Sequence, residues 1–267
     1  MSIVSTTDQP FQGAPGPRTA SALLEVAVTS ERDVPGADEG GADRVFVVDR
    51  VGDGGLSPEP ALVSSICKET ELPVRVMLRL NDTHTTTGGE LARLVGLADS
   101  YLTLGAEGVA FGFLDSDLGV DEEVCRTLAD RLDGVPWTFH RAIDSALEVD
   151  RAWRRLIGLP GLDAVHSAGS PRGMGAGHDE LTDRAAASPA VARLLMAGGG
   201  LEGEHVPWLV RAGVRQFHVG RSVRPGGSPK AYVDPALVRS WRLLLDDAVE
   251  RAVHASQAAR ADGRTAG

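Results

Sequence analysis

Ionisable side chains stand within or directly after short apolar segments of this chain. Glu25 lies inside the apolar run 22–28, and His218 lies near the end of the run 214–219. A carboxylate in an apolar segment is costly unless it is paired, and a histidine titrates near neutral pH, which suits it to general acid–base catalysis. These features predict a proton-transfer site, whose candidate catalytic residues are Glu25, Arg79, His140, Arg141, Asp144 and His218.

The expected roles follow from the chemistry of each side chain. Glu25 or His140 is the candidate general base and His218 the candidate acid. Arg79 and Arg141 are expected to hold a carboxylate or phosphate of the substrate, and Arg79 is also the expected partner of Glu25. The structural alternative is a buried ion pair that sets strand register and does no chemistry.

Two glycine-rich turns form a second candidate site. Gly198, Gly199 and Gly200 follow one apolar run, and Gly220 and Arg221 follow the next. Exposed backbone N–H groups can hold an anion. In (β/α)₈ barrels, phosphate often binds at the turns after the seventh and eighth strands. The predicted anion-binding residues are Gly199, Gly200, Gly220 and Arg221; alternatively, the glycines only make tight turns and Arg221 pairs with a helix carboxylate at the surface.

Eight short apolar runs, each followed by a helical pattern, would position these residues. Such runs are typical of strands buried on both faces. A glycine stands one to three residues before four of the runs, as expected where a helix ends and a strand begins. This alternation predicts a single (β/α)₈ TIM barrel over 21–255, with an open doubly wound sheet as the alternative. The predicted strands are 22–28, 44–48, 74–79, 108–113, 136–140, 162–166, 193–197 and 214–219.

Length and composition narrow the class of protein. The 267 residues suit one large domain, and the net charge of −10 argues against a nucleic-acid partner. No apolar run is long enough for a membrane span. Cys67 and Cys125 both fall in predicted helices, which argues against disulfides and favours the cytoplasm. Residues 1–20 and 256–267 are expected to be a disordered lead and tail; a homodimer is possible, but no sequence feature decides it.

Several motifs together resemble the CutC family, named for a copper homeostasis protein. They are LLE at 23–25, GADRV at 41–45, GGLSP at 54–58, TFHRAID at 138–144, AGGG at 197–200 and FH at 217–218. The likeness runs from about residue 22 to 249. It implies a TIM-barrel fold and a cytoplasmic role in copper binding or handling.

The chain departs from the family pattern where thiols are common. Family members often carry cysteines at the ends of the first two strands, where this chain has Ala27, Val28 and Val48. Phe46 replaces a common carboxylate of the second strand. After the third strand, 79–83 reads RLNDT in place of Arg-Pro-Arg-Gly-Gly, and the serine that ends strand eight gives way to Val219, Gly220 and Arg221.

Three functions remain open from the sequence. Copper homeostasis is implied by the resemblance alone, since Cu(I) prefers thiolate and thioether ligands and only His140, His166 and His218 remain as candidate ligands at strand ends. The second is an enzyme of lyase or isomerase type, with no evident cofactor, acting on a small anionic or phosphorylated metabolite. The third is a non-catalytic binding barrel.

Overall fold

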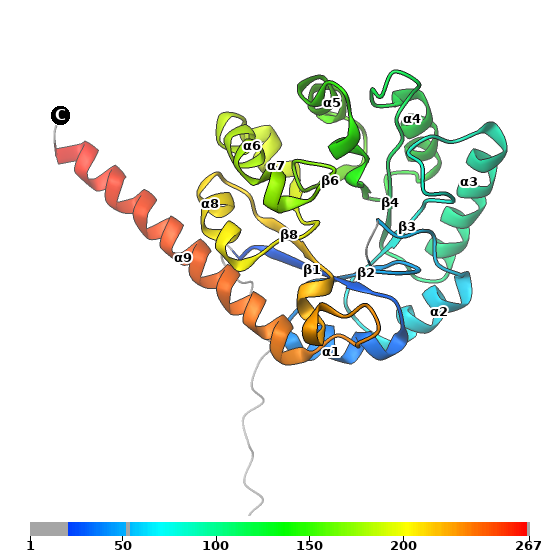
Figure 1. The fold of residues 1–267 in the computed structure, drawn as a ribbon, viewed down its shortest axis with the longest axis horizontal. Coiled ribbons are helices and arrows are strands. Elements are labelled where there is room, and N and C mark those ends of the chain that lie inside the picture. The colour runs from blue at the N-terminus through cyan, green and yellow to red at the C-terminus, as the bar shows by residue number, and fades with distance from the viewer. Residues whose placement is uncertain (1–20, 52–53, 266–267) are drawn as a thin grey trace, which may run out of the picture.

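The computed structural model describes residues 21–51 and 54–265, and side chains as far as residue 258. Eight parallel strands close into a barrel in the order of the sequence, because β1 pairs with β8 as well as with β2. Figure 1 shows helices arranged around these strands. The predicted single (β/α)₈ barrel is therefore confirmed and the open sheet is excluded, while the predicted disordered lead at 1–20 lies outside the described residues.

The strands are shorter than most of the predicted runs, because the chain leaves the ladder before its apolar character ends. At β7 the difference is at the start, where Arg193 and Leu194 belong to helix α7 and not to the strand. The strands are β1 Leu23–Val28, β2 Arg44–Val47, β3 Val74–Met77, β4 Gly108–Phe111, β5 Trp137–Phe139, β6 Leu162–Ser167, β7 Leu195–Ala197 and β8 Gln216–Val219.

Helices connect successive strands on the outside of the barrel. They are α1 Val34–Gly40, α2 Pro60–Glu69, α3 Gly88–Thr103, α4 Glu122–Arg131, α5 Val149–Leu156, α6 Met174–Ala187, α7 Pro189–Leu194, α8 Val206–Arg211 and α9 Pro235–Thr265. Cys67 lies in α2 and Cys125 in α4, as predicted. Within the described residues, no helix combines the length and the apolar character that crossing a bilayer requires.

The glycine turns predicted before four strands are present. Gly41, Gly105, Gly161 and Gly213 have φ of 88°, 107°, 72° and 98°. Residues with a Cβ rarely adopt these values, so glycine ends each connection and directs the chain into the sheet.

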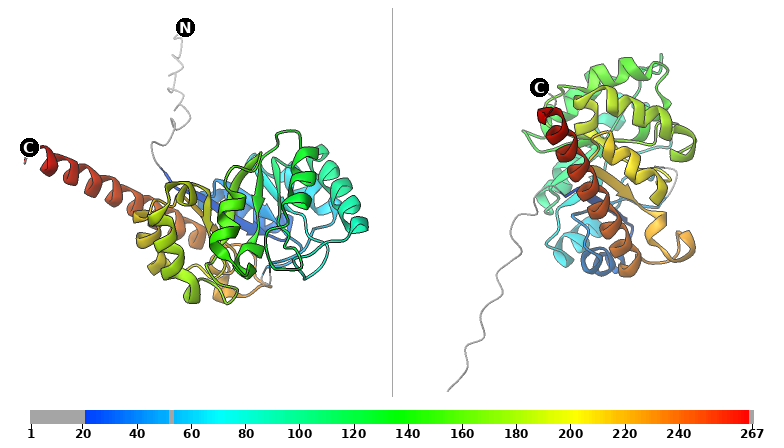
Figure 2. Two further views of the ribbon diagram at one scale, coloured as in Figure 1. Left: turned by 90° about the horizontal axis from the view of Figure 1, so that it is seen from above. Right: turned by 90° about the vertical axis from the view of Figure 1, so that its left-hand side faces the viewer.

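Helix α9 packs beside α1 and α8 and then continues beyond the barrel (Figure 2). Its first half contributes Val238, Leu245 and Val249 to the core. The predicted disordered tail from residue 256 is not what the structure has, because α9 extends to Thr265.

The inside of the barrel changes character from one end to the other. Near the amino ends of the strands, Arg75 donates to Asp163 and Glu107, and to the hydroxyl of Thr138. Near the carboxyl ends, an apolar cluster is formed by Ala27, Phe46, Val48, Met77 and Ala110. The strand ends therefore lie above a charged layer and beside an apolar wall.

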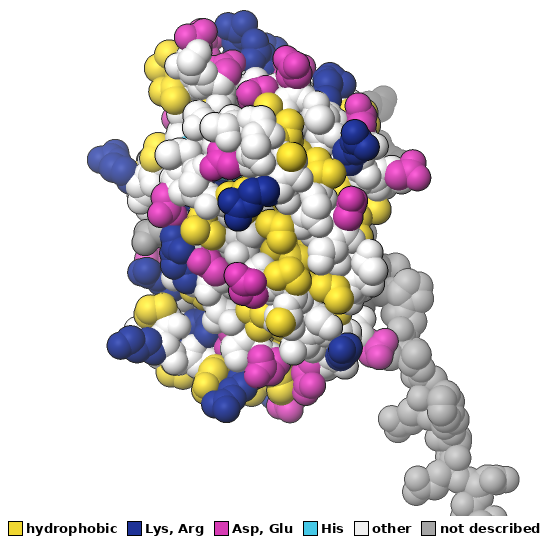
Figure 3. Space-filling view, turned by 90° about the vertical axis from the view of Figure 1, so that its right-hand side faces the viewer, with side chains coloured by type: hydrophobic (Ala, Val, Ile, Leu, Met, Phe, Trp, Pro, Cys, Tyr) yellow, Lys and Arg dark blue, Asp and Glu magenta, His cyan; other side chains and the backbone are white. Residues whose placement is uncertain are grey.

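The outer surface over α2 and α3 carries charges of both signs, interspersed with apolar side chains (Figure 3). This face lacks the single-sign basic stripe that a nucleic-acid-binding surface would show.

Candidate functional site

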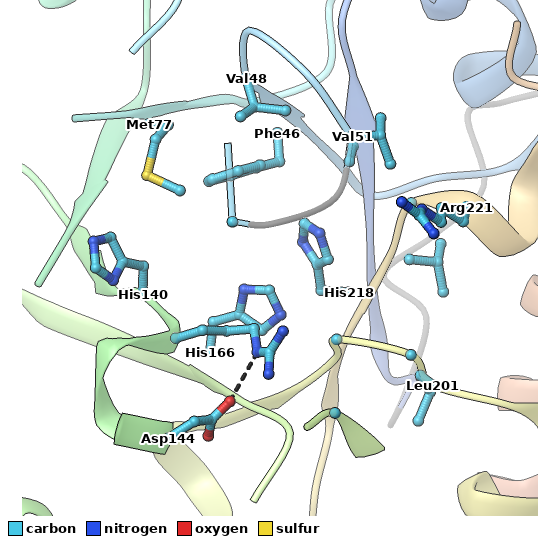
Figure 4. A pocket seen from close by; sticks show the side chains of 18 of the residues that line it. Phe46, Val48, Val51, Met77, His140, Asp144, His166, Leu201, His218 and Arg221 are labelled. Carbon is cyan, nitrogen blue, oxygen red and sulfur yellow. Dashed lines mark hydrogen bonds and ion pairs between the residues drawn. The ribbon is translucent and has the colours of Figure 1, made fainter. Parts of the chain in front are cut away.

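A cavity of about 900 Å³ opens at the carboxyl ends of the strands. Figure 4 shows its histidines, its apolar wall and Arg221 around one space. Most predicted site residues line it: Arg79, His140, Arg141, Asp144, His166, Gly199, Gly200, His218, Gly220 and Arg221. The barrel therefore brings the two predicted sites together in a single cavity.

Glu25 is the exception, because it lies below the cavity and is 1% exposed. The strand register places Arg44 of β2 opposite it on one side and His218 of β8 on the other. Arg44 Nε donates to Glu25 Oε2 over 2.6 Å, and His218 Nδ1 lies 2.7 Å from Oε1. The predictions that Glu25 pairs with Arg79 and shares the cavity are wrong, since Arg79 follows β3 and stands nearer the mouth. Glu25 reaches the cavity only through His218.

The ionised state of Glu25 determines which ring nitrogen of His218 carries the proton. Burial alone would raise the pKa of this carboxyl, but the charge of Arg44 and the hydrogen bond with His218 hold the pKa well below its ordinary value. An ionised carboxylate only accepts hydrogen bonds, so His218 Nδ1 must carry the proton. Nε2, the other ring nitrogen, has no hydrogen-bond partner among the described residues, and the ring itself lines the cavity.

Neighbouring rings fix the His218 imidazole further. The Phe46 ring meets it edge-on, with centroids 5.3 Å apart and planes at 81°. The His166 ring, from β6, lies close to the same imidazole, with centroids 4.3 Å apart. A Cβ at Gly198 would come within 2.5 Å of His166 Nε2 and 2.9 Å of His218 Cβ, so only glycine leaves room for both rings.

His140 and His166 are held in the neutral form. Burial, and after it the neighbouring positive charges, lower the pKa of both imidazoles well below the ordinary value. The Nε2 atoms of both rings are buried with no partner among the described residues. A buried polar nitrogen without a partner is costly, so each is a position where a ligand or water would be stabilised.

Asp144 orients Arg141 and is itself saturated. Its carboxylate accepts from Arg141 Nε over 2.8 Å, from Ser167 Oγ over 2.6 Å and from the Ala168 N–H. Burial raises the pKa of Asp144, while Arg141 and the hydrogen bonds oppose that rise. With both oxygens occupied, Asp144 is suited to positioning and not to proton transfer.

Arg141 is fixed on three sides. Besides Asp144, its Nη2 donates to the Ser170 carbonyl over 3.0 Å. Its guanidinium also packs against Gly199, where a Cβ would lie 2.7 Å from Nε. Gly199 therefore has a packing reason as well as a φ of 80°.

Arg79 is 6% exposed and binds backbone carbonyls of the loops beside it. It donates to Asp82 O over 2.7 Å, with longer contacts to Gly55 O and Thr83 O. These hydrogen bonds connect the loops after β2 and β3. They also use part of the hydrogen-bonding capacity of the Arg79 guanidinium.

The predicted anion-binding residues offer unused donors. Among the described residues, nothing accepts from the N–H groups of Gly199, Gly200 and Gly220, and no carboxylate lies within ion-pair distance of Arg221. Among the described residues, the charged side chains that line the cavity are Arg50, Arg79, Arg141, Arg172 and Arg221 against Asp82, Asp144 and Glu202, or five minus three. This positive excess stands out in a chain of net charge −10.

The donor set does not fit a thiolate copper site. Within the described part of the chain, no group of three or more His, Cys, Asp or Glu side chains could hold a metal ion, so the candidate ligands His140, His166 and His218 do not form one. Cys67 and Cys125 lie on outer helices, and burial raises the pKa of Cys125 to about 12. Met77 is the only sulfur ligand that lines the cavity in the described residues.

Sequence reasoning missed several residues that shape the site. Arg44 and Arg75 stand near the amino ends of apolar strands. A charged side chain in an apolar strand was the signal in the sequence that could have identified them. His84 and Ser145 also line the cavity, with His84 Nε2 3.3 Å from Ser145 Oγ. They come from two different loops, so no spacing in the sequence connects them.

Comparisons with known proteins agree with this architecture. A sequence model described as the CutC family matches residues 22–223. The human "Copper homeostasis protein cutC homolog" is 28% identical, covering 77% of this chain and 76% of its own. A CutC family protein of Xylella fastidiosa strain Temecula1 is 31% identical, covering 76% of each chain.

Solved structures support the fold. The putative copper homeostasis protein CutC from Streptococcus agalactiae superposes with a TM-score of 0.64 at 23% identity, over 74% of this chain and 98% of that one. A putative dihydrodipicolinate synthetase from Pseudomonas aeruginosa gives 0.57 at 15% identity, over 88% and 80%.

Proposed function

The chain belongs to the CutC family, and within that family we propose that it is an enzyme that moves a proton on a small anionic metabolite bound at the mouth of the barrel. The observation that carries the proposal is the Glu25–His218 pair. Its histidine lines a cavity in which, among the described residues, arginines outnumber carboxylates. His218 would be the general base, because Glu25 fixes the proton on Nδ1 and leaves Nε2 to face the ligand.

The anion would be held opposite the histidines. Arg221, Arg141 and the N–H groups of Gly199 and Gly200 would supply the hydrogen bonds, and a guanidinium can bind a carboxylate or phosphate with two parallel bonds. The apolar wall of Phe46, Val48 and Met77 would exclude water and strengthen these interactions.

Ligand-dependent thermal stabilisation tests the anion site. Inorganic phosphate and small carboxylates should raise the Tm of the wild type in proportion to ligand concentration. A charge-assisted hydrogen bond is worth about 1.5–3 kcal/mol, so Arg221→Ala should raise the Kd roughly 10- to 100-fold.

Arg211→Ala is the matched control, because Arg211 is exposed, stacks on Trp208 and lies outside the cavity. It should leave the Kd unchanged. Absence of stabilisation in the wild type, or equal losses in the two variants, would refute the anion site. A protein that binds anions but shows no His218-dependent chemistry on any of them would be the non-catalytic binding barrel.

Copper handling is the second candidate, and it rests on the names of the relatives. The residues present give it little support, since the cavity has no thiol and its described side chains form no metal-binding group. Cytoplasmic location also belongs to the proposal and is supported by the two unpaired cysteines.

A further inference from the structure

The hydrogen-bonding state of His140 is fixed by the backbone after β5. The Ala142 N–H donates to His140 Nδ1 over 3.1 Å, so Nδ1 is an acceptor and carries no proton. A neutral ring must then carry its proton on Nε2. That atom is buried without a partner among the described residues, and the residue, 4% exposed, lines the cavity.

His218 has the opposite arrangement. Its Nδ1 donates to the ionised Glu25, so a neutral ring presents Nε2 as an acceptor. The two imidazoles therefore line one cavity in opposite states: a neutral His140 carries its proton on Nε2, whereas a neutral His218 has a lone pair on Nε2. Each state is imposed by a contact outside the cavity, and neither depends on a ligand.

Such a pair suits one reaction class. Removing a proton from a carbon atom is easy only when a neighbouring carbonyl can take the electron pair as an enolate. The acceptor of such a site takes the proton, and a neutral donor stabilises the charge that develops on the carbonyl oxygen. A charged imidazolium is not needed, and burial keeps the pKa of His140 too low for one to form near neutral pH.

Resting on the function proposed above, we infer that the substrate is an anionic carbonyl compound, which the enzyme deprotonates at the carbon beside the carbonyl. His218 Nε2 accepts the proton, the C–H electron pair becomes the new C=C bond, and the carbonyl π pair moves to oxygen. His140 Nε2–H donates to that oxygen, while Arg221 and Arg141 hold the anionic group. Return of a proton from His218 to the same carbon, with the oxygen electron pair re-forming the C=O bond, restores the neutral carbonyl and completes the exchange.

Hydrogen–deuterium exchange tests this assignment without knowledge of the natural substrate. Two probes, pyruvate and dihydroxyacetone phosphate, carry the carbonyl with a carboxylate or with a phosphate. The enzyme in D₂O should remove their ¹H NMR signals beside the carbonyl, about 10²- to 10⁴-fold faster than the same concentration of free imidazole. The probe that exchanges faster identifies the class of anion.

Lactate and glycerol 3-phosphate are the matched probes, because they keep the anion but have no acidic C–H. They should bind and slow the exchange of the carbonyl probes, and they should not exchange themselves. His218→Asn should abolish the exchange. His140→Phe should lower it roughly 10²- to 10³-fold, the cost of one lost donor to a developing oxyanion.

His140→Gln guards against a folding defect, because its amide can still donate and should recover part of the rate that His140→Phe loses. Exchange that depends on both histidines supports the inference. Anions that stabilise the wild type through Arg221, with no exchange of either carbonyl probe, would overturn it and leave the proposed anion site standing. Failure of all four probes to bind would overturn both.

Discussion

Glu25→Gln should be among the most destabilising single substitutions in this barrel. Glu25 and Arg44 are 1% and 4% exposed, and their ion pair spans 2.6 Å. After the substitution, the nearest carboxylate to Arg44 is Asp163 at 3.7 Å, which already pairs with Arg75 at 2.8 Å. A buried charge that loses its partner costs about 3–5 kcal/mol, so the free energy of unfolding at pH 7 should fall by that amount.

Urea unfolding followed by circular dichroism measures this loss, with equal m-values required for the comparison. The matched control is Glu107→Gln, which removes a carboxylate that is about one-third exposed and leaves Arg75 paired with Asp163. A pair exposed to that degree contributes about 0–1 kcal/mol. If Glu25→Gln cost no more than Glu107→Gln, the triad of Arg44, Glu25 and His218 would not be the anchor of the site.

The same prediction has a pH dependence with a definite sign. The pKa of Glu25 is lower in the folded protein than its ordinary value of 4.5. A lowered carboxyl pKa stabilises the fold above the unfolded value, and that stability is lost as the pH falls toward the folded value. The difference between wild type and Glu25→Gln should therefore be constant near neutrality and shrink below about pH 4.5.

Three further predictions follow from the cavity. Gly198→Ala should lower the free energy of unfolding, measured by urea unfolding, by about 1–3 kcal/mol, because the new Cβ would lie 2.5 Å from His166 Nε2. The control Gly175→Ala has open space around it in α6 and should stabilise the protein by up to about 1 kcal/mol. Equal effects of the two substitutions would contradict this account. The pKa of His166 is lower in the folded protein than in the unfolded chain, so the unfolded state binds more protons and stability should decline as the pH falls below about 6.5. His166→Gln should make that decline shallower. An unchanged slope would count against burial of a neutral ring. Cu(I) titration against a competing chelator should show weak, non-stoichiometric binding, and a tight one-to-one complex that survives Cys67→Ser with Cys125→Ser would show that prediction to be wrong.

The fold could be predicted from the sequence because its signals are local. Each of Gly41, Gly105, Gly161 and Gly213 marks a helix end within a few residues of a strand, and the apolar runs repeat in step with them. Strand ends were less certain, as at Arg193, because an apolar run continues from a helix into a strand without a change in composition.

The partners within the site were harder to predict than its members. Glu25 carried a clear signal, yet its partner depends on register, which relates residues in different strands and has no local signature. Arg44 lies directly opposite Glu25 in β2, whereas Arg79 lies in the loop that follows β3. His84 and Ser145 were missed for the same reason, since only the closed barrel brings their loops together.

The departures from the family pattern act together on the charge of the cavity. Ala27 and Val48 stand where family members often carry cysteine, and with Phe46 they line the cavity as an apolar wall. Phe46 also replaces a common carboxylate and packs edge-on against His218. Thiolates and a carboxylate at these positions would attract a cation. An apolar wall instead leaves an excess of arginine over carboxylate among the described lining residues, and it lowers the local dielectric constant. Since Glu25 lies beneath this wall and remains paired with His218, the proposed function would keep its proton-transfer pair while the preference of the site would shift from a soft cation to an anion.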